Sequence, residues 1–116
     1  MRQYHTGERI VAAGEPASSI FFLRSGMVSV KLANGVRLAS LAQGMEFGEM
    51  SLIEEFRTAD VWADTHVVCL EMPIEQFDEF CERYPRTGQR IVRNLVILLA
   101  KRLIMANTKV GVLSAY

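Results

Sequence analysis

The segment from Phe47 to Val61 combines residue types that suit the binding of a small anion. Gly48 has no Cβ, so backbone N–H groups beside it can approach a ligand closely at the start of a short helix. The carboxylate of Glu49 can accept hydrogen bonds from sugar hydroxyls. The guanidinium of Arg57 can donate two parallel hydrogen bonds to phosphate oxygens. This spacing predicts a compact site for a ligand that carries both a sugar and a phosphate.

The composition indicates one globular domain. The chain has 116 residues and half of them are hydrophobic, which is enough for one packed core. No apolar run reaches the length of a membrane span, and the N-terminus has no apolar signal region. Cys69 and Cys81 lack metal-type spacing, so we interpret them as reduced core thiols of a cytoplasmic protein.

Charge is distributed unevenly although the net charge is zero. All 13 acidic residues lie at or before Glu82, whereas Arg86 to Tyr116 contain Lys and Arg but no acid. One interpretation is a basic helix that packs on its own acidic body, and the other is a basic surface for nucleic acid or an acidic partner. The first is favoured because no aromatic residues interleave with the charges.

The pattern from about Gly7 to Met72 predicts short strands that are separated by glycines. Val28, Val30 and Leu32 alternate with Ser29 and Lys31, which predicts one core face and one solvent face. Six glycines punctuate this part at spacings of about one strand, which favours a compact β-roll. The candidate strands are Ile10–Ala13, Ile20–Leu23, Val28–Ala33, Val36–Ala42, Ala59–Ala63 and Val67–Met72, with a hairpin expected at Asn34-Gly35.

Helical spacing replaces the strand pattern after Pro73. A short helix is expected over about 74–84 and a long helix over about 87–110. The long helix is apolar over a wide arc, with a stripe formed by Val92, Leu95, Val96, Leu99, Leu103, Ala106 and Val110. Either the whole arc packs on its own domain, or the helix also forms a homodimer contact with a second copy, and the second is favoured.

In this order of elements, the chain resembles the cyclic nucleotide-binding domain family. Three segments carry the resemblance: Gly7 to Ala17, Ile20 to Val30, and the cassette that opens at Gly44 and continues through Gly48-Glu49 to Arg57-Thr58-Ala59. The resemblance covers nearly everything from Gly7 to Leu113. It implies a mostly β fold, a double-stranded β-helix or jelly-roll-like β-roll followed by a short and a long α-helix. Residues 1–116 are then expected to form a single domain, with the roll over about 7–72.

The resemblance also implies a set of site residues. Arg57 would pair with the cyclic phosphate and Glu49 would accept the ribose 2′-hydroxyl. The base would be met from the long helix, where the residues matching the usual pair of adjacent hydroxyl side chains are Ala106 and Asn107. The expected ligand-binding residues are Gly48, Glu49, Met50, Ser51, Arg57, Thr58, Ala59 and Asn107.

Two departures from the family pattern concern the cassette. The loop from Glu49 to Arg57 is about a residue shorter than in most of the family, and Phe56 stands where Gly and Pro are usual. Glu54 and Glu55 bring negative charge near the proposed anion site, which is expected to weaken binding unless they point to solvent.

The favoured function is a regulatory sensor that binds cAMP or cGMP and relays binding through the C-terminal helix. The alternative is a ligand-free dimerisation or interaction module with a degenerate pocket. The chain has no helix-turn-helix after Gly111, so we expect no direct nucleic-acid binding. The segment from Arg57 to Thr65 resembles modules appended to bacterial sulfate-permease-type transporters and glutaminases. This resemblance implies a larger parent protein, and a position on the cytosolic face if that parent is a transporter.

Catalysis by a metal-holding β-roll is disfavoured. Such a site needs clustered histidines and carboxylates, and a nucleophilic site needs a paired base. The two histidines, His5 and His66, lie far apart in the sequence without a paired motif. We therefore expect neither an enzyme nor a metal or cofactor in this segment.

Overall fold

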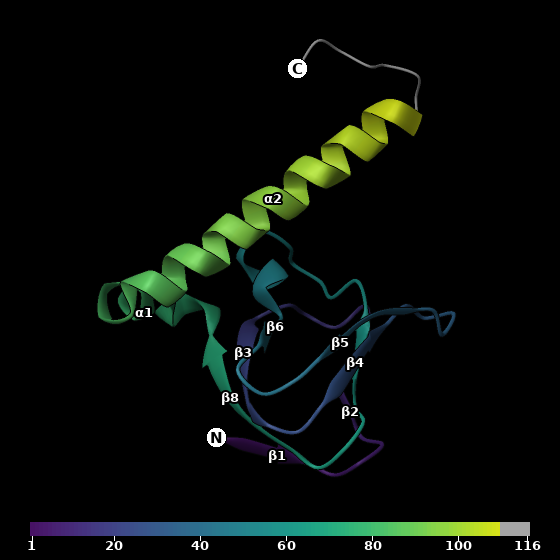
Figure 1. The fold of residues 1–116 in the computed structure, drawn as a ribbon, viewed down its shortest axis with the longest axis vertical. Coiled ribbons are helices and arrows are strands. Elements are labelled where there is room, and N and C mark those ends of the chain that lie inside the picture. Colours follow the sequence, from purple (N-terminus) through teal and green to yellow (C-terminus); the bar gives the residue numbers. More distant parts are fainter. Residues whose placement is uncertain (110–116) are drawn as a thin grey trace. The chain divides into compact units, whose positions relative to one another are not determined.

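The computed structural model describes residues 1–109, which fall into two compact units, Met1–Phe77 and a second unit that begins at Asp78. Figure 1 shows the strands of the first unit curling into a roll, and α2 as one long continuous helix. The strands are β1 (Arg2–Tyr4), β2 (Arg9–Val11), β3 (Ser19–Ser25), β4 (Val28–Lys31), β5 (Arg37–Leu41), β6 (Glu46–Phe47), β7 (Asp60–Ala63) and β8 (Val67–Pro73). The helices are the 3-10 turns η1 (Glu49–Leu52) and η2 (Ile74–Gln76), then α1 (Phe77–Arg83) and α2 (Pro85–Lys109).

The roll consists of two four-stranded antiparallel sheets. One sheet has the order β1-β8-β3-β6 and the other has the order β2-β7-β4-β5. Apolar side chains from both sheets meet in one cluster, which is the core of the unit. Its buried members are Val11, Phe21, Leu23, Val28, Phe47, Val61, Ala63, Val67 and Cys69. The predicted class, mostly β with C-terminal helices, is confirmed.

The expected strands are found within two residues of their predicted ends, but two further strands were not predicted. Strands β1 and β6 have three and two residues, which is too short for an alternating pattern to show. The prediction that Ser29 faces solvent from β4 is wrong, because this residue is completely buried. Its hydroxyl donates a hydrogen bond to the Asp64 carboxylate at 2.5 Å, which compensates for the burial of a polar group.

The hairpin at Asn34-Gly35 is present with a longer turn than the dipeptide suggested. Residues 32–36 connect β4 to β5, and the Leu32 N–H donates to the Val36 carbonyl. Gly35 has a φ of 87°, but Asn34 does not have a positive φ. Instead, the Asn34 side-chain oxygen accepts the Val36 N–H at 3.0 Å, so an Asx turn takes the place of a second left-handed residue.

The second unit confirms a short helix followed by a long one. Pro85 is the first residue of α2, a position where its missing N–H costs nothing, and residue 110 lies outside the described residues. Gly88 lies in the second turn of α2, and a Cβ there would stand 2.5 Å from the Cys81 Sγ of α1. The glycine therefore lets the two helices approach closely. Among the described residues no helix is long and apolar enough to cross a membrane.

Candidate functional site

Gly48 forms the turn between β6 and the 3-10 helix η1. Its φ of 83° is left-handed, a conformation that glycine adopts without steric cost. A Cβ at this position would lie 2.8 Å from the Arg57 Nη1 and 2.8 Å from the Ser19 carbonyl oxygen. Both the backbone conformation and the close approach of Arg57 therefore require glycine here.

The Arg57 guanidinium lies against this turn and is held by three hydrogen bonds. Its Nη1 donates to Ser51 Oγ at 2.9 Å and to the Gly48 carbonyl at 3.3 Å. Its Nη2 donates to the Ser19 carbonyl at 2.9 Å, and the group lies 5.9 Å from the centre of the Phe21 ring. The Nε–H and the second N–H of Nη2 have no partner among the described residues. Two donors of one cation are thus left for a further acceptor.

The backbone of Arg57 is fixed by the turn that connects β2 to β3. The Arg57 N–H donates to the Glu15 carbonyl at 2.7 Å, and the Gly14 N–H donates to the Arg57 carbonyl at 2.8 Å. Pro16 and Phe56 form an isolated antiparallel bridge beside them. Neither this contact nor the role of Ser19 shows in the sequence, because backbone groups make these bonds and leave no side-chain signal.

Glu49 carries a buried carboxylate next to Gly48. Its Oε2 atom is buried and has no hydrogen-bond partner. Burial raises the pKa of this carboxyl, and Glu46 raises it further, while the backbone N–H of Glu49 and the charge of Arg57 act in the opposite direction. An unsatisfied buried oxygen of this kind is costly, so Glu49 is suited to accept a hydrogen bond from a ligand.

Arg57 experiences the same low-polarity environment. Burial lowers the pKa of its guanidinium, while Glu71, Glu15 and Glu49 raise it through their charges. Arg57 nevertheless forms no ion pair within the described part of the chain. It remains a partly desolvated cation without an opposite charge in contact, an arrangement that favours an anionic ligand.

A cavity of about 270 Å³ adjoins Arg57 within the first unit. Apolar side chains and two carboxylates share its lining, which consists of Ile10, Val11, Glu15, Pro16, Ser18, Phe21, Arg57 and Glu71. No motif in the sequence indicated that Glu15 and Glu71 lie beside Arg57.

The structure places the other predicted residues as follows. Ser51 is buried, and its hydroxyl donates to the Ser19 carbonyl at 2.9 Å while it accepts from Arg57. Met50 is half-buried in η1, Thr58 is exposed, and Ala59 is half-buried just before β7. Gly48, Glu49, Ser51 and Arg57 are therefore brought together. Asn107 belongs to α2, and its side chain lies outside the described residues.

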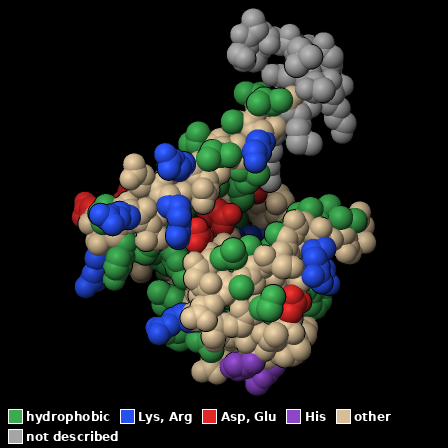
Figure 2. Space-filling model, in the orientation of Figure 1, with side chains coloured by type: hydrophobic (Ala, Val, Ile, Leu, Met, Phe, Trp, Pro, Cys, Tyr) green, Lys and Arg blue, Asp and Glu red, His purple; other side chains and the backbone are tan. Residues whose placement is uncertain are grey.

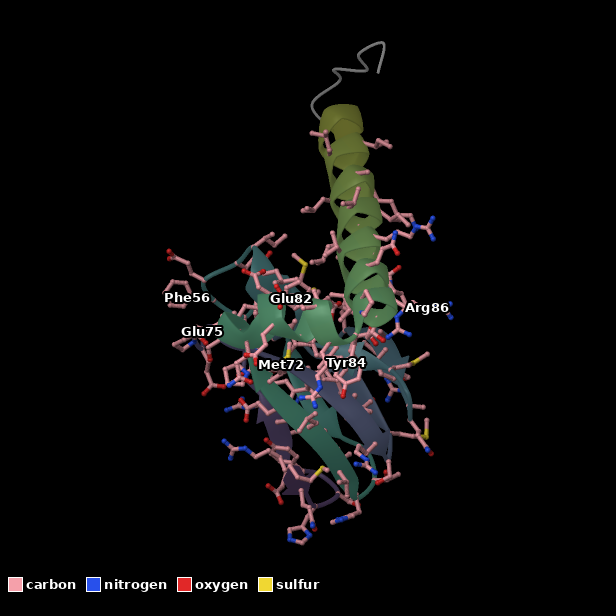
Figure 3. All side chains as sticks on the ribbon, turned by 90° about the vertical axis from the view of Figure 1, so that its left-hand side faces the viewer. Phe56, Met72, Glu75, Glu82, Tyr84 and Arg86 are labelled. Atoms are coloured by element: carbon pink, nitrogen blue, oxygen red, sulfur yellow. The ribbon has the colours of Figure 1, made fainter. Side chains whose placement is uncertain are left out.

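The two acidic side chains of the loop before Arg57, Glu54 and Glu55, differ in their exposure to solvent. Glu55 is exposed, as is Phe56, whose side chain projects outward from the loop in Figure 3. Glu54 differs, because one of its carboxylate oxygens is buried. The short loop therefore turns Glu55 and Phe56 towards solvent and keeps Glu54 inside.

Comparison with known proteins assigns this arrangement to a class. The model of the family described as "Cyclic nucleotide-binding domain" matches residues 1–84. The chain belongs to this family. Among solved structures, the Thermus thermophilus catabolite activator protein is similar with a TM-score of 0.70 and 30% identity, over 95% of this chain and 52% of that one. A regulatory subunit of a cAMP-independent protein kinase A from Trypanosoma brucei matches with a TM-score of 0.64 and 27% identity, over 76% of this chain and 34% of that one.

Curated relatives include two enzymes that are much longer than this chain. Glutaminase 2 of Bradyrhizobium diazoefficiens is 58% identical over 99% of the chain, and glutaminase 1 of the same organism is 51% identical over 99%. The chain spans 18% and 19% of their lengths. The human hyperpolarization-activated cyclic nucleotide-gated channel 4 is 35% identical over 71% of the chain and 7% of its own length. The predicted likeness to modules of glutaminases is confirmed.

Proposed function

We propose that this chain is a regulatory sensor module that binds cAMP or cGMP between Arg57 and Glu49. The observation that carries the proposal is the pairing of a half-buried cation that keeps two free N–H donors with a buried carboxylate oxygen that has no partner. A cyclic phosphate carries one negative charge, which Arg57 can meet with two parallel bonds. A ribose hydroxyl can donate to Glu49 Oε2.

Binding of the phosphate can use the two free N–H donors of Arg57, with at most one of its three existing hydrogen bonds given up. The bond to the Gly48 carbonyl is the longest of the three at 3.3 Å, so it is the one lost at least cost when the ligand arrives. The bonds to Ser19 and Ser51 can remain and keep the guanidinium in place. Gly48, Met50, Thr58 and Ala59 complete the proposed cradle, and Asn107 stays a prediction for the base.

The test is a calorimetric and thermal-shift titration with cAMP, cGMP and cyclic dinucleotides. Ligand at about 100 times its dissociation constant is expected to stabilise the chain by about 2.7 kcal/mol. Arg57→Ala is expected to abolish the shift. Arg37→Ala is the matched control, because Arg37 is exposed on β5 and donates to Ser40 Oγ at 3.3 Å. Absence of heat with every nucleotide at millimolar concentration would refute the proposal.

We further propose that the parent protein is a glutaminase, that the module itself is not catalytic, and that it acts in the cytoplasm. The relatives that match 99% of the chain support the first point, and the free thiols of Cys69 and Cys81 agree with a reducing compartment. Regulation would follow from a differential affinity of the nucleotide for two positions of the C-terminal helix, typically about 1–3 kcal/mol.

A separate observation supports a second candidate function, which is dimerisation through α2. Val92, Val96, Leu99 and Leu103 follow each other at intervals of four, three and four residues, and their side chains are 40–60% exposed. This spacing is that of a coiled-coil seam. A Val96→Glu variant is expected to be monomeric in light scattering where the unmodified chain is dimeric. Asn94→Glu is the control, because Asn94 is exposed and lies on the face of α2 opposite these four residues, and a monomeric unmodified chain would refute this candidate.

A further inference from the structure

The two histidines of the chain face each other although they lie far apart in the sequence. The ring centroids of His5 and His66 are 5.9 Å apart and the ring planes are inclined by 49°. Figure 2 shows both side chains together at one end of the roll. Tyr4 and Val67 form the last pair of the β1–β8 ladder, so His5 and His66 occupy the next opposed positions beyond it. The fold has turned two separate residues into a cross-strand pair.

We propose that His5 and His66 form a two-histidine site for a divalent transition-metal ion such as Zn²⁺, Ni²⁺ or Cu²⁺. A metal binds imidazole nitrogen at about 2.0–2.1 Å, which puts it about 3.2 Å from the ring centroid. Two imidazoles on one ion therefore have centroids about 5–6 Å apart for angles from tetrahedral to about 140°. The observed 5.9 Å lies within this range, so the two rings are already spaced as two imidazole ligands of one ion would be.

The backbone on both sides of this pair is held by short hydrogen bonds. The His5 N–H donates to Glu8 Oε1 at 2.8 Å, and the Glu8 N–H donates to the His5 carbonyl at 3.0 Å. Next to His66, Thr65 Oγ accepts the Met27 N–H at 3.0 Å and donates to the His66 carbonyl at 3.1 Å. The two histidines are thus presented from fixed turns, which reduces the entropy lost when a metal brings them together.

Both histidines are exposed, so their ring nitrogens are accessible and water can complete the coordination shell. Within residues 1–109 no group of three or more His, Cys, Asp or Glu side chains is placed to hold a metal. The site therefore differs from a four-ligand structural zinc centre and exchanges its ion readily. Imidazole favours Cu²⁺, Ni²⁺ and Zn²⁺ over Mg²⁺ and Ca²⁺, and Cu²⁺ is expected to bind most tightly. A bound ion would fasten β1, a three-residue strand at the edge of its sheet, to the turn before β8.

The proposal is tested on the untagged chain after removal of metal with a chelator. Calorimetric titration with CuCl₂, NiCl₂, ZnCl₂ and MgCl₂ is expected to show one site for the first three ions and no binding of Mg²⁺. His5→Ala and His66→Ala are each expected to weaken binding at least tenfold. Gln3→Ala, an exposed change on β1 two residues before His5, should leave binding unchanged. The paramagnetic spectrum of the Cu²⁺ form is expected to show two nitrogen ligands.

Three outcomes would overturn the proposal. They are no binding of Zn²⁺ or Cu²⁺ at millimolar concentration, equal binding by the unmodified chain and both histidine variants, and a loss of binding in only one of the two variants. Because both side chains are exposed, their replacement is expected to leave the melting temperature of the metal-free chain unchanged, which separates loss of a ligand from loss of the fold.

Discussion

Replacement of Gly48 by alanine tests whether the close approach of Arg57 defines the cassette. Gly44→Ala is a matched control, because Gly44 has a similar φ of 87° but an added Cβ there would meet nothing within 4 Å. Both variants pay for a left-handed alanine, which costs roughly 1–2 kcal/mol. Gly48→Ala also places a methyl group 2.8 Å from the Ser19 carbonyl, which is backbone and cannot move aside easily.

The additional cost of Gly48→Ala follows from the hydrogen bonds that the methyl group displaces. Relief of the clash moves Arg57 away from Ser19 or Gly48, and loss of a hydrogen bond to a charged group costs about 1.5–3 kcal/mol. We therefore expect a total loss of about 2.5–5 kcal/mol for Gly48→Ala, against roughly 1–2 kcal/mol for Gly44→Ala. At about 4 °C per kcal/mol for a domain of this size, the melting temperatures should differ by roughly 8 °C.

Urea and thermal unfolding of both variants measure this difference directly. Equal destabilisation by Gly48→Ala and Gly44→Ala would refute the reasoning, because it would mean that Arg57 and Ser19 do not crowd Gly48 in solution. Stabilisation by either variant would show that the left-handed turns are absent.

Two further changes probe buried groups. Burial raises the pKa of Glu49 above its ordinary value of 4.5, so the folded protein holds this proton more tightly than the unfolded chain, and stability falls as the pH rises from about 4.5 through the raised pKa. Glu49→Gln should therefore have a higher free energy of unfolding in urea than the unmodified chain at pH 7 but not at pH 4. Glu55→Gln, which changes an exposed side chain, is the control. An increase in stability at pH 4 alone would contradict this reasoning. Gly88→Ala should destabilise the helical unit, although alanine favours helix by about 1 kcal/mol, because the new Cβ would stand 2.5 Å from Cys81 Sγ. Cys81→Ala should restore the stability of the Gly88→Ala variant in a double-mutant cycle measured by circular dichroism.

Local chemistry explains which parts of the fold could be predicted from the sequence. The six glycines of the β part all have positive φ, and their spacing predicted the strand lengths because only glycine adopts that conformation freely. Helical periodicity after Pro73 predicted both helices. Strands β1 and β6 were not predicted, because runs of three and two residues are too short to show an alternating pattern.

Burial and pairing between distant segments depended on the tertiary structure. Ser29 was predicted to face solvent from its place in an alternating strand, yet it is buried because Asp64 lies beside it to accept its hydroxyl. His5 and His66 were separated by most of the roll in sequence, and only the β1–β8 ladder opposes them.

The residue types of the cassette were determined by the sequence alone. A glycine, a carboxylate and an arginine at this spacing predicted an anion site, because each supplies a different property: free backbone approach, hydrogen-bond acceptance and a positive charge. The tertiary structure decided how those groups are held. Arg57 is anchored by carbonyls of Ser19 and Gly48, and its backbone is fixed by the turn at Glu15. Such backbone acceptors are the same in every residue, so only the folded chain shows which of them lie within hydrogen-bonding distance.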